Sequence, residues 1–240
     1  MEPHPPTLAI SGLRAGFPGP QGLVPAVDGV DLTVPRGTIV GLVGESGCGK
    51  SVTALSVLGL LPPNGQVAGG TIDFGGQDLL TLPPDALRRL RGDRIAMIFQ
   101  DPMTSLNPVY PVGRQVAEVL RLHRGLDRKA AKARTVDLFH QVGIPDPAAR
   151  YGAYPRQLSG GLRQRVMIAM AMACEPELLI ADEPTTALDA PIQAQTLRLM
   201  GALSRDHRTA IPTITHNMGG GAKPWDEAHP LHAGHNVAAA

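Results

Sequence analysis

The chain has 240 residues, and its 22 lysines and arginines nearly balance 21 aspartates and glutamates, for a formal net charge of +1. This balance argues against a nucleic-acid-binding protein, because such proteins neutralise phosphates with an excess of basic residues. Hydrophobic residues make up 43% of the chain, which excludes a wholly disordered protein and allows one large domain or two small ones. The longest apolar run, Val166 to Cys174, has 9 residues and is too short to cross a bilayer. With two cysteines, no C-x-x-C pair and no signal-peptide pattern, we expect a soluble chain in a reducing compartment.

The predicted elements alternate between strands and helices. Strands are expected at residues 8–13, 29–34, 38–43, 71–74, 95–99 and 178–181, with a turn-rich connection over 16–21. Helices are expected at residues 51–61, 112–142, 159–173 and 192–203, the third of them capped by Ser159. This alternation predicts an α/β fold with a largely parallel sheet and a helical insertion.

The last part of the chain fits the pattern less well. A strand is expected at residues 209–215, although Pro212 would remove one donor from its ladder. Residues 217–240 contain three consecutive glycines and two prolines and show no clear period. We therefore expect one domain over 1–240, with a core of about 1–100 and 166–216, a helical part of about 101–165 and an atypical tail over 217–240.

A glycine-rich loop follows the strand at 38–43 and precedes a helix, which is the context that a phosphate-binding loop requires. It matches G-x-x-x-x-G-K-[ST] in the residues Gly44, Glu45, Ser46, Gly47, Cys48, Gly49, Lys50 and Ser51. Its backbone N–H groups and the helix N-terminus would hold the phosphates of a nucleotide. Lys50 would contact the β- and γ-phosphates, and the Ser51 hydroxyl would bind Mg²⁺.

The apolar strand at 178–181 ends in two carboxylates, Asp182 and Glu183. A strand that ends in two carboxylates is common, but in a chain that also contains a phosphate-binding loop it indicates a nucleotide-hydrolysing site. Asp182 would reach the Mg²⁺ shell, and Glu183 would act as the general base for the attacking water.

Further motifs resemble those of the ATP-binding cassette (ABC) ATPases. Residues 158–165 resemble the LSGGQ-type signature of that family, and Gln100 matches its Q-loop. Residues 186–189 match its D-loop, and His216 matches its switch histidine. The order of these motifs over residues 8–216 is that of the family. The resemblance implies a P-loop NTPase fold with an ABC-type nucleotide-binding domain: a mostly parallel sheet core, an antiparallel β part and a helical subdomain.

The resemblance also implies site residues, since two such domains bind ATP between one phosphate-binding loop and the other signature. The implied nucleotide-binding residues are Phe17, Gly44, Glu45, Ser46, Gly47, Cys48, Gly49, Lys50, Ser51, Val52, Gln100, Ser159, Gly160 and Gly161. The implied catalytic residues are Glu183, His216 and Lys50, and the Mg²⁺ site comprises Ser51, Gln100 and Asp182. Phe17 would stack on adenine, or alternatively pack on the sheet.

A narrower resemblance is to the di- and oligopeptide/nickel importer subfamily, through residues 101–108, Tyr154-Pro155 and residues 181–189. It implies an ATPase that powers import of peptides or nickel at the cytoplasmic face of the membrane. The implied partners are a second ATPase subunit, identical or related, and two permeases, one of which docks a coupling helix after Gln100. An external solute-binding protein completes the system, and no nucleic acid is involved.

Two alternatives stay open, and parts of the sequence depart from the family pattern. The alternatives are a soluble ABC ATPase without a permease and a structural subunit that has lost turnover; a GTPase is excluded because no N-K-x-D motif occurs. Asn217 stands where the family has Asp, and the cysteine-containing extension of longer members is absent from this sequence. His229, His232 and His235 recur every three residues, but Pro230 argues against a helical metal site.

Overall fold

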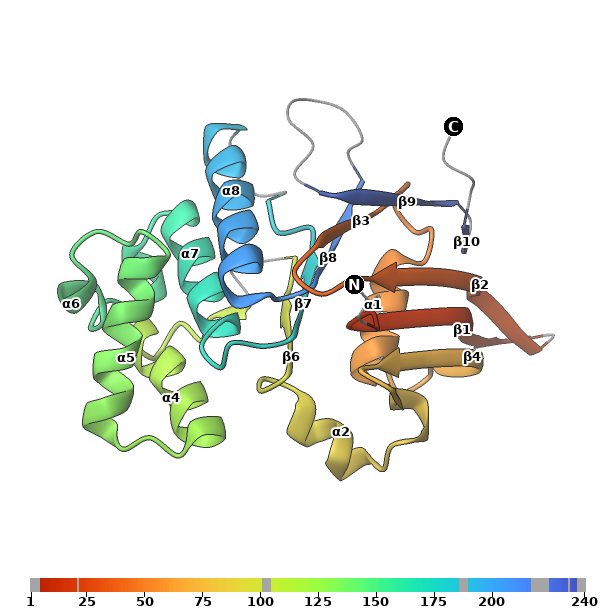
Figure 1. Cartoon of the computed structure of the whole chain (residues 1–240), viewed down its shortest axis with the longest axis horizontal. Helices are drawn as coiled ribbons and strands as arrows, with labels where there is room; N and C mark the ends of the chain where they lie inside the picture. The colour runs from red at the N-terminus through yellow and green to blue at the C-terminus, as the bar shows by residue number, and fades with distance from the viewer. Residues whose placement is uncertain are drawn as a thin grey trace.

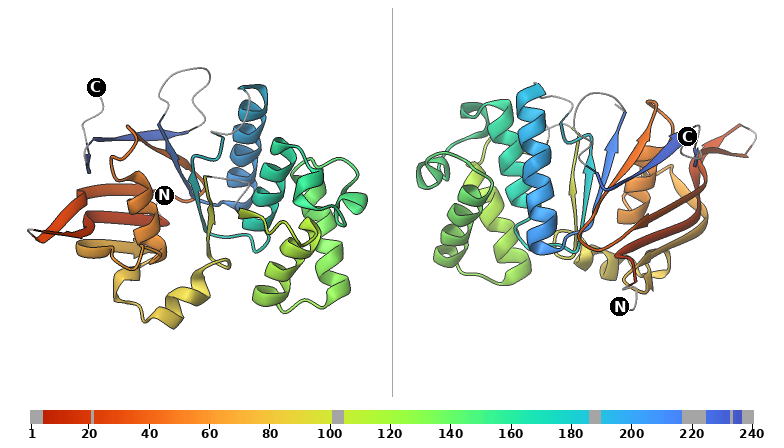
Figure 2. Two further views of the ribbon diagram at one scale, coloured as in Figure 1. Left: turned by 180° about the vertical axis from the view of Figure 1, so that it is seen from behind. Right: turned by 45° about the horizontal axis from the view of Figure 1, so that its top comes forward.

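The computed structural model describes residues 5–20, 22–100, 105–185, 190–216, 225–232 and 234–236. It consists of two β-sheets on one side of the molecule and a lobe of helices on the other (Figure 1). Figure 2 shows the same division from behind and from above. Within the described residues, no helix combines the length and the apolar character needed to span a bilayer.

The first sheet is antiparallel and has the strand order β2-β1-β4-β5. Its strands are β1 (Leu8–Gly19), β2 (Gly22–Val34), β4 (Gln66–Phe74) and β5 (Gln77–Asp78). The hairpin of β1 and β2 extends beyond β4, because the pairing of β1 with β4 ends at Gly16 while its pairing with β2 continues to Gly19. The expected turn-rich connection at 16–21 is therefore wrong for residues 16–19. Pro18 is tolerated in β1 because the strand has a neighbour on only one side there.

The second sheet has the order β10-β9-β3-β8-β7-β6 and is parallel except for β10. Its strands are β3 (Ile39–Gly44), β6 (Ile95–Ile98), β7 (Leu178–Asp182), β8 (Ile211–Thr215), β9 (Glu227–His232) and β10 (His235–Asn236). Side chains alternate between two hydrophobic cores, one on each face. Leu178 and Ile180 of β7 belong to the core shared with the antiparallel sheet, while Leu179 and Ala181 belong to the core under the helices. A strand buried on both faces reads as a continuous apolar run.

The helices separate into two groups. Their bounds are α1 (Lys50–Leu58), α2 (Pro84–Leu90), α4 (Val112–Arg124), α5 (Arg128–Gln141), α6 (Pro147–Arg150), α7 (Gly160–Ala171) and α8 (Ala190–His207), with 3-10 turns η1 (Leu79–Thr81) and η2 (Pro155–Gln157). Helix α1 contributes to the core that both sheets share, whereas α4, α5 and α7 build the second core. The single helical run expected over 112–142 is two helices, because the chain turns at Gly125 in a left-handed conformation.

Pro212 lies inside β8, a central strand with neighbours on both sides. The N–H groups of Ile211 and Ala210 donate to Thr38 of the β3 side and to Glu177 of the β7 side, respectively. The alternation along a parallel strand therefore directs the backbone of Pro212 toward β7, where its missing N–H removes one donor. The paired residues of β7 and β8 are accordingly few: Ala181 with Thr213, and Asp182 with Ile214.

The part of the tail that the structure describes joins the large sheet. Strand β9 pairs with β3 in parallel from Val40–Glu227 to Gly44–Leu231. The Asp226 side chain accepts a hydrogen bond from the Ile39 N–H at 2.8 Å, and its own N–H donates to the Ile39 carbonyl at 2.8 Å. The Trp225 ring lies against Gly41, where an added Cβ would be 3.0 Å from the ring. Strands thus form where the sequence indicated no element.

Candidate nucleotide-binding site

The glycine-rich loop connects β3 to α1 and is enclosed by two distant segments. Gly49, the residue before α1, has φ +96°, and a Cβ there would lie 2.3 Å from the Ala26 carbonyl oxygen. A Cβ on Gly44 would lie 2.2 Å from the carbonyl oxygen of Leu231 in β9. Both contacts exclude any side chain, so glycine at these positions lets the loop pack between β2 and β9.

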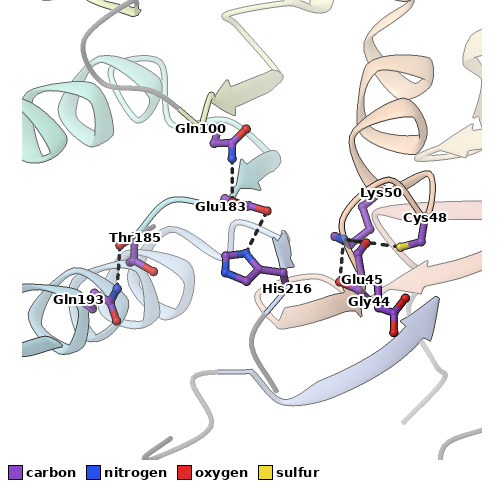
Figure 3. A network of polar contacts seen from close by, with 9 residues as sticks. All are labelled: Gly44, Glu45, Cys48, Lys50, Gln100, Glu183, Thr185, Gln193 and His216. Carbon is purple, nitrogen blue, oxygen red and sulfur yellow. Dashed lines mark hydrogen bonds and ion pairs between the residues drawn. The ribbon is translucent and has the colours of Figure 1, made fainter. Parts of the chain in front are cut away.

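Lys50 is buried within the loop rather than extended into solvent. Its Nζ donates to the carbonyl oxygens of Gly44 at 2.8 Å and Glu45 at 2.7 Å, and lies 3.5 Å from the Cys48 Sγ (Figure 3). Helix α1 begins here with no side-chain cap and no acidic residue in its first turn. Such a helix end presents unsatisfied N–H groups and the positive end of the helix dipole, which suit a phosphate.

Asp182, at the end of β7, is buried and adjoins the loop. It forms a side-chain hydrogen bond with Ser51, while burial, the largest influence, raises the pKa of its carboxyl above the usual value. Within the described residues its Oδ1 is buried without a hydrogen-bond partner. A buried carboxylate oxygen without a partner beside a serine hydroxyl is a donor set that a hard divalent cation favours.

Glu183 connects three segments that are far apart in the sequence (Figure 3). Its Oε2 accepts a hydrogen bond from the Gln100 Nε2 at 2.8 Å, and its Oε1 lies 3.1 Å from the His216 Nδ1. Its backbone has φ +47°, and its N–H donates to the Ile214 carbonyl. The side chain of Glu183 is 15% exposed and that of His216 is 49% exposed, so the carboxylate is mostly buried while the imidazole is half exposed.

Outside the signature, the remaining predicted nucleotide-binding residues lie in the loop and the first turn of α1, except Phe17, which lies in β1. Glu45, Ser46, Gly47 and Ser51 are exposed, Cys48 is buried and Val52 is half-buried. Phe17 is half-buried in the β1–β2 hairpin, with its ring edge close to Gly65.

The signature residues start α7, on the opposite face of the large sheet from α1. Ser159 caps this helix, accepting from the Leu162 N–H at 3.4 Å, as the sequence indicated. Ser159 and Gly160 are exposed and Gly161 is half-buried. A single chain therefore does not bring the signature to its own phosphate-binding loop (Figure 1).

The D-loop prediction, residues 186–189, lies outside the described residues. Immediately before it, the Thr185 carbonyl accepts a hydrogen bond from the Gln193 Nε2 at 2.9 Å (Figure 3). Within the described residues, no group of three or more His, Cys, Asp or Glu side chains could hold a metal ion.

Sequence reasoning missed the support that the tail gives to the loop. The Gly234 N–H donates to the Cys48 carbonyl at 3.1 Å, and the Gly234 carbonyl accepts from the Asp28 N–H at 2.8 Å. In the sequence, the only signal for this support is that Trp225-Asp226 and Ala233-Gly234 bear a faint likeness to the strands that ABC ATPases have there.

Comparison with known proteins identifies the family. The ABC transporter sequence profile matches residues 27–186. This chain belongs to the ABC transporter ATPases. The ABC ATPase is 48% identical to the oligopeptide transport ATP-binding protein OppD of Haemophilus influenzae, over 97% of this chain and 72% of that protein. It is 50% identical to the dipeptide transport ATP-binding protein DppD of Escherichia coli, over 88% of this chain and 64% of that protein.

A solved structure confirms the fold class of this ABC ATPase. The ATP-binding cassette MJ0796, in a dimeric post-hydrolysis state bound to ADP and Pi, is 26% identical in sequence. It superposes with a TM-score of 0.82 over 95% of this chain and 96% of that one. The predicted P-loop NTPase fold and membership of the family of transport-coupled ATPases are therefore confirmed.

Proposed function

We propose that this chain is the ATP-hydrolysing subunit of an ABC importer for peptides, with nickel as the other solute that its subfamily resemblance allows. The observation that carries the catalytic part is the Gln100–Glu183–His216 cluster at the end of β7, next to Asp182 and the phosphate-binding loop. The relatives named for oligopeptide and dipeptide transport support the choice of solute.

The loop and α1 hold the triphosphate. The uncapped N-terminus of α1 and the backbone of Gly44 to Gly49 face the anion, and Lys50 adds a positive charge once its Nζ leaves the carbonyls of Gly44 and Glu45. Val52 follows this turn, and Phe17 is the candidate for contact with the base.

Ser51 and Asp182 would hold Mg²⁺, with Gln100 as a further ligand once it leaves Glu183. The buried Asp182 Oδ1 and its neighbouring Ser51 hydroxyl fit such an ion. When bound, the ion would neutralise charge on the phosphate oxygens.

Glu183 serves as the general base. Its carboxylate accepts a proton from water as the water oxygen attacks the γ-phosphorus and the bond to the ADP oxygen breaks. His216, 3.1 Å from Glu183, orients this carboxylate and the water.

A second subunit completes the site. Because Ser159, Gly160 and Gly161 lie across the sheet from the loop of their own chain, they serve the nucleotide held by a partner cassette. Their position at the start of the twelve-residue helix α7 supplies N–H donors for the γ-phosphate.

An apolar groove beside the Q-loop is the proposed permease site. It encloses about 540 Å³ along the edge strand β6 and is lined by Phe99, Met97, Val119, Met167 and Met170 among others. Phe99 is 45% exposed and directly precedes Gln100. A permease helix in this groove would thus adjoin the residue that contacts Glu183, at the cytoplasmic face of the membrane.

The substitution Glu183→Gln tests the catalytic assignment. We expect ATP turnover to fall by at least about a hundredfold, because removal of a general base typically costs 10²–10⁴ in rate, while ATP binding is retained. Phosphate release and calorimetric titration with Mg-ATP measure the two properties.

The matched control is Glu227→Gln, which changes an exposed carboxylate on β9. Turnover by Glu183→Gln at the level of this control would refute the general-base role. Failure of the unsubstituted chain, assembled with its permeases, to hydrolyse ATP would favour a structural subunit. Stimulation of the reconstituted transporter by Ni²⁺ and not by peptides would refute the assignment of peptides and favour nickel as the solute.

A further inference from the structure

A basic cavity of about 640 Å³ lies between α4 and α5, away from the nucleotide-binding residues. Arg114 and Arg121 line it from α4, and Arg128 and Lys132 line it from α5. Glu118 is the one acidic side chain among its lining residues. Residues 114, 118 and 121 are three and four positions apart, so they share one face of α4.

These four cations differ from several basic residues elsewhere on the protein, which form ion pairs with carboxylates. Ion pairs join Arg94 to Glu177, Arg124 to Asp93 and Arg134 to Glu175. In the part of the chain that the structure describes, no ion pair involves any of the four cations of the cavity. Lys132 instead lies 5.3 Å from the centre of the Tyr151 ring. Among the described lining residues, the four cations thus outnumber the single carboxylate of Glu118, and the cavity carries a net positive charge.

Two of these cations, Arg114 and Arg128, lie in the first turns of their helices, where a positive charge is electrostatically unfavourable. Arg128 is the first residue of α5 and Arg114 is the third residue of α4, and neither helix has an acidic residue in its first turn. Only the cap residue Asp127 supplies a negative charge at the start of α5. Because the helix N-terminus is itself positive, this arrangement favours a bound anion.

Exposed apolar side chains flank the cavity. Leu122 of α4 is 75% exposed, and Val109 and Tyr110, just before α4, are 69% and 54% exposed. Tyr110 also lines the cavity. Basic side chains beside exposed apolar ones match the two layers of an anionic phospholipid surface, the headgroups and the acyl boundary.

We propose that this face of α4 and α5 binds the headgroups of anionic phospholipids. Helix α4 contributes Val119 to the apolar groove and Arg121 to the basic cavity, so one helix would adjoin both permease and lipid. The inference goes beyond the proposed transport function and can be tested without a permease.

The test is co-sedimentation of the full chain with vesicles of phosphatidylcholine alone and of equal parts phosphatidylcholine and phosphatidylglycerol. We expect binding to the anionic vesicles only, weakened by salt. The combined substitution R114Q/R121Q/R128Q/K132Q should reduce that binding by about tenfold or more. The second variant, Leu122→Gln, should weaken binding while leaving all charges in place.

The matched control is R88Q/R89Q/R198Q/R205Q, which removes the same charge from exposed positions of α2 and α8. Equal loss of binding in both quadruple variants would overturn the proposal, because net charge alone would then explain it. Absence of wild-type binding to anionic vesicles would also overturn it. If the first variant instead lost only its association with a permease, the partner would be an acidic protein segment.

ATP turnover in the absence of membranes separates this inference from the proposed function. The cavity variant should hydrolyse ATP at the wild-type rate, because none of its four substituted residues lies in the nucleotide-binding site. Thermal unfolding of each variant verifies that the exposed substitutions leave the fold intact.

Discussion

Asp182 and Glu183 are adjacent in sequence but have different surroundings. Asp182 ends β7 and is buried beside Ser51, whereas Glu183 has left the strand with a positive φ and meets Gln100 and His216. From the order of the two carboxylates after a strand, we predicted separate roles for them, and these roles stay predictions. The sequence did not reveal that both oxygens of Glu183 contact other side chains, because Gln100 and His216 follow different strands.

Because Asp182 is buried, we predict that replacing its carboxylate by a neutral group stabilises the nucleotide-free protein. Burial raises the pKa of this carboxyl in the folded state, so its ionised form is disfavoured on folding at neutral pH. Stability linked to this group is present below the unfolded pKa and is lost as pH rises through the folded pKa. Asp182→Asn should therefore raise the Tm at pH 7, where 1 kcal/mol corresponds to roughly 2–4 °C for a chain of this size.

Calorimetry as a function of pH checks this prediction. The difference in Tm between Asp182→Asn and wild type should shrink toward zero near the ordinary aspartate pKa, since both side chains are then uncharged. The same variant should bind Mg-ATP more weakly. A lower Tm than wild type at pH 7 would contradict the argument.

At the scale of single elements, the sequence predicted motifs better than boundaries. The phosphate-binding loop, the strand before Asp182 and the helix capped by Ser159 follow from local patterns, and the structure contains all three. The extension of β1 through Pro18 depends on pairing with β2, and the strand at Glu227–His232 depends on pairing with β3. Such non-local partners leave no periodic signal in segments rich in glycine and proline.

The turn between α4 and α5 starts with a glycine in a left-handed conformation. Gly125 ends α4 with φ +65°, and no atom lies within 4 Å of the position that its Cβ would occupy. Substitution by alanine therefore adds conformational strain without a clash. We expect Gly125→Ala to lower the free energy of unfolding by about 1 kcal/mol, measured by urea denaturation.

The matched control for this substitution is Gly152→Ala. Gly152 has no positive φ, and its Cβ would meet only the Ala149 carbonyl oxygen at 3.9 Å. The control should be neutral or slightly stabilising. Equal effects of the two substitutions would show that the left-handed turn at Gly125 is not what separates the helices.

At the scale of the whole molecule, the C-terminal strands connect the two sheets to the loop. Leu231 closes over Gly44, Gly234 bonds to Cys48 and Asp28, and the Asn236 side chain donates to the Asp31 carbonyl in β2. The nucleotide-binding loop is therefore enclosed by residues from both ends of the chain. We therefore expect the shape of the loop to depend on the pairing of β9 with β3.

Asp226 exchanges two hydrogen bonds with Ile39, at the opposite end of β3 from Gly44. A substitution of Asp226 can therefore weaken the pairing of β9 with β3 without touching the loop. We expect Asp226→Ala to lower the free energy of unfolding by about 1–2 kcal/mol and to weaken ATP binding, measured by denaturation and calorimetric titration.

Asp226→Asn retains an acceptor oxygen and is the matched control. It should stay close to wild type in both measurements. If Asp226→Ala lost stability but bound ATP with unchanged affinity, the loop would not depend on β9.

Trp225 is the single tryptophan of the chain, and its half-buried ring lies on Gly41 of β3. Intrinsic fluorescence excited at the indole band therefore comes from one place, the start of the β9 segment. Release of that segment would expose the indole to water and shift its emission to the red, while the tyrosines elsewhere would contribute little. The protein thus carries an optical reporter of how its C-terminal strand is seated, with no label to attach.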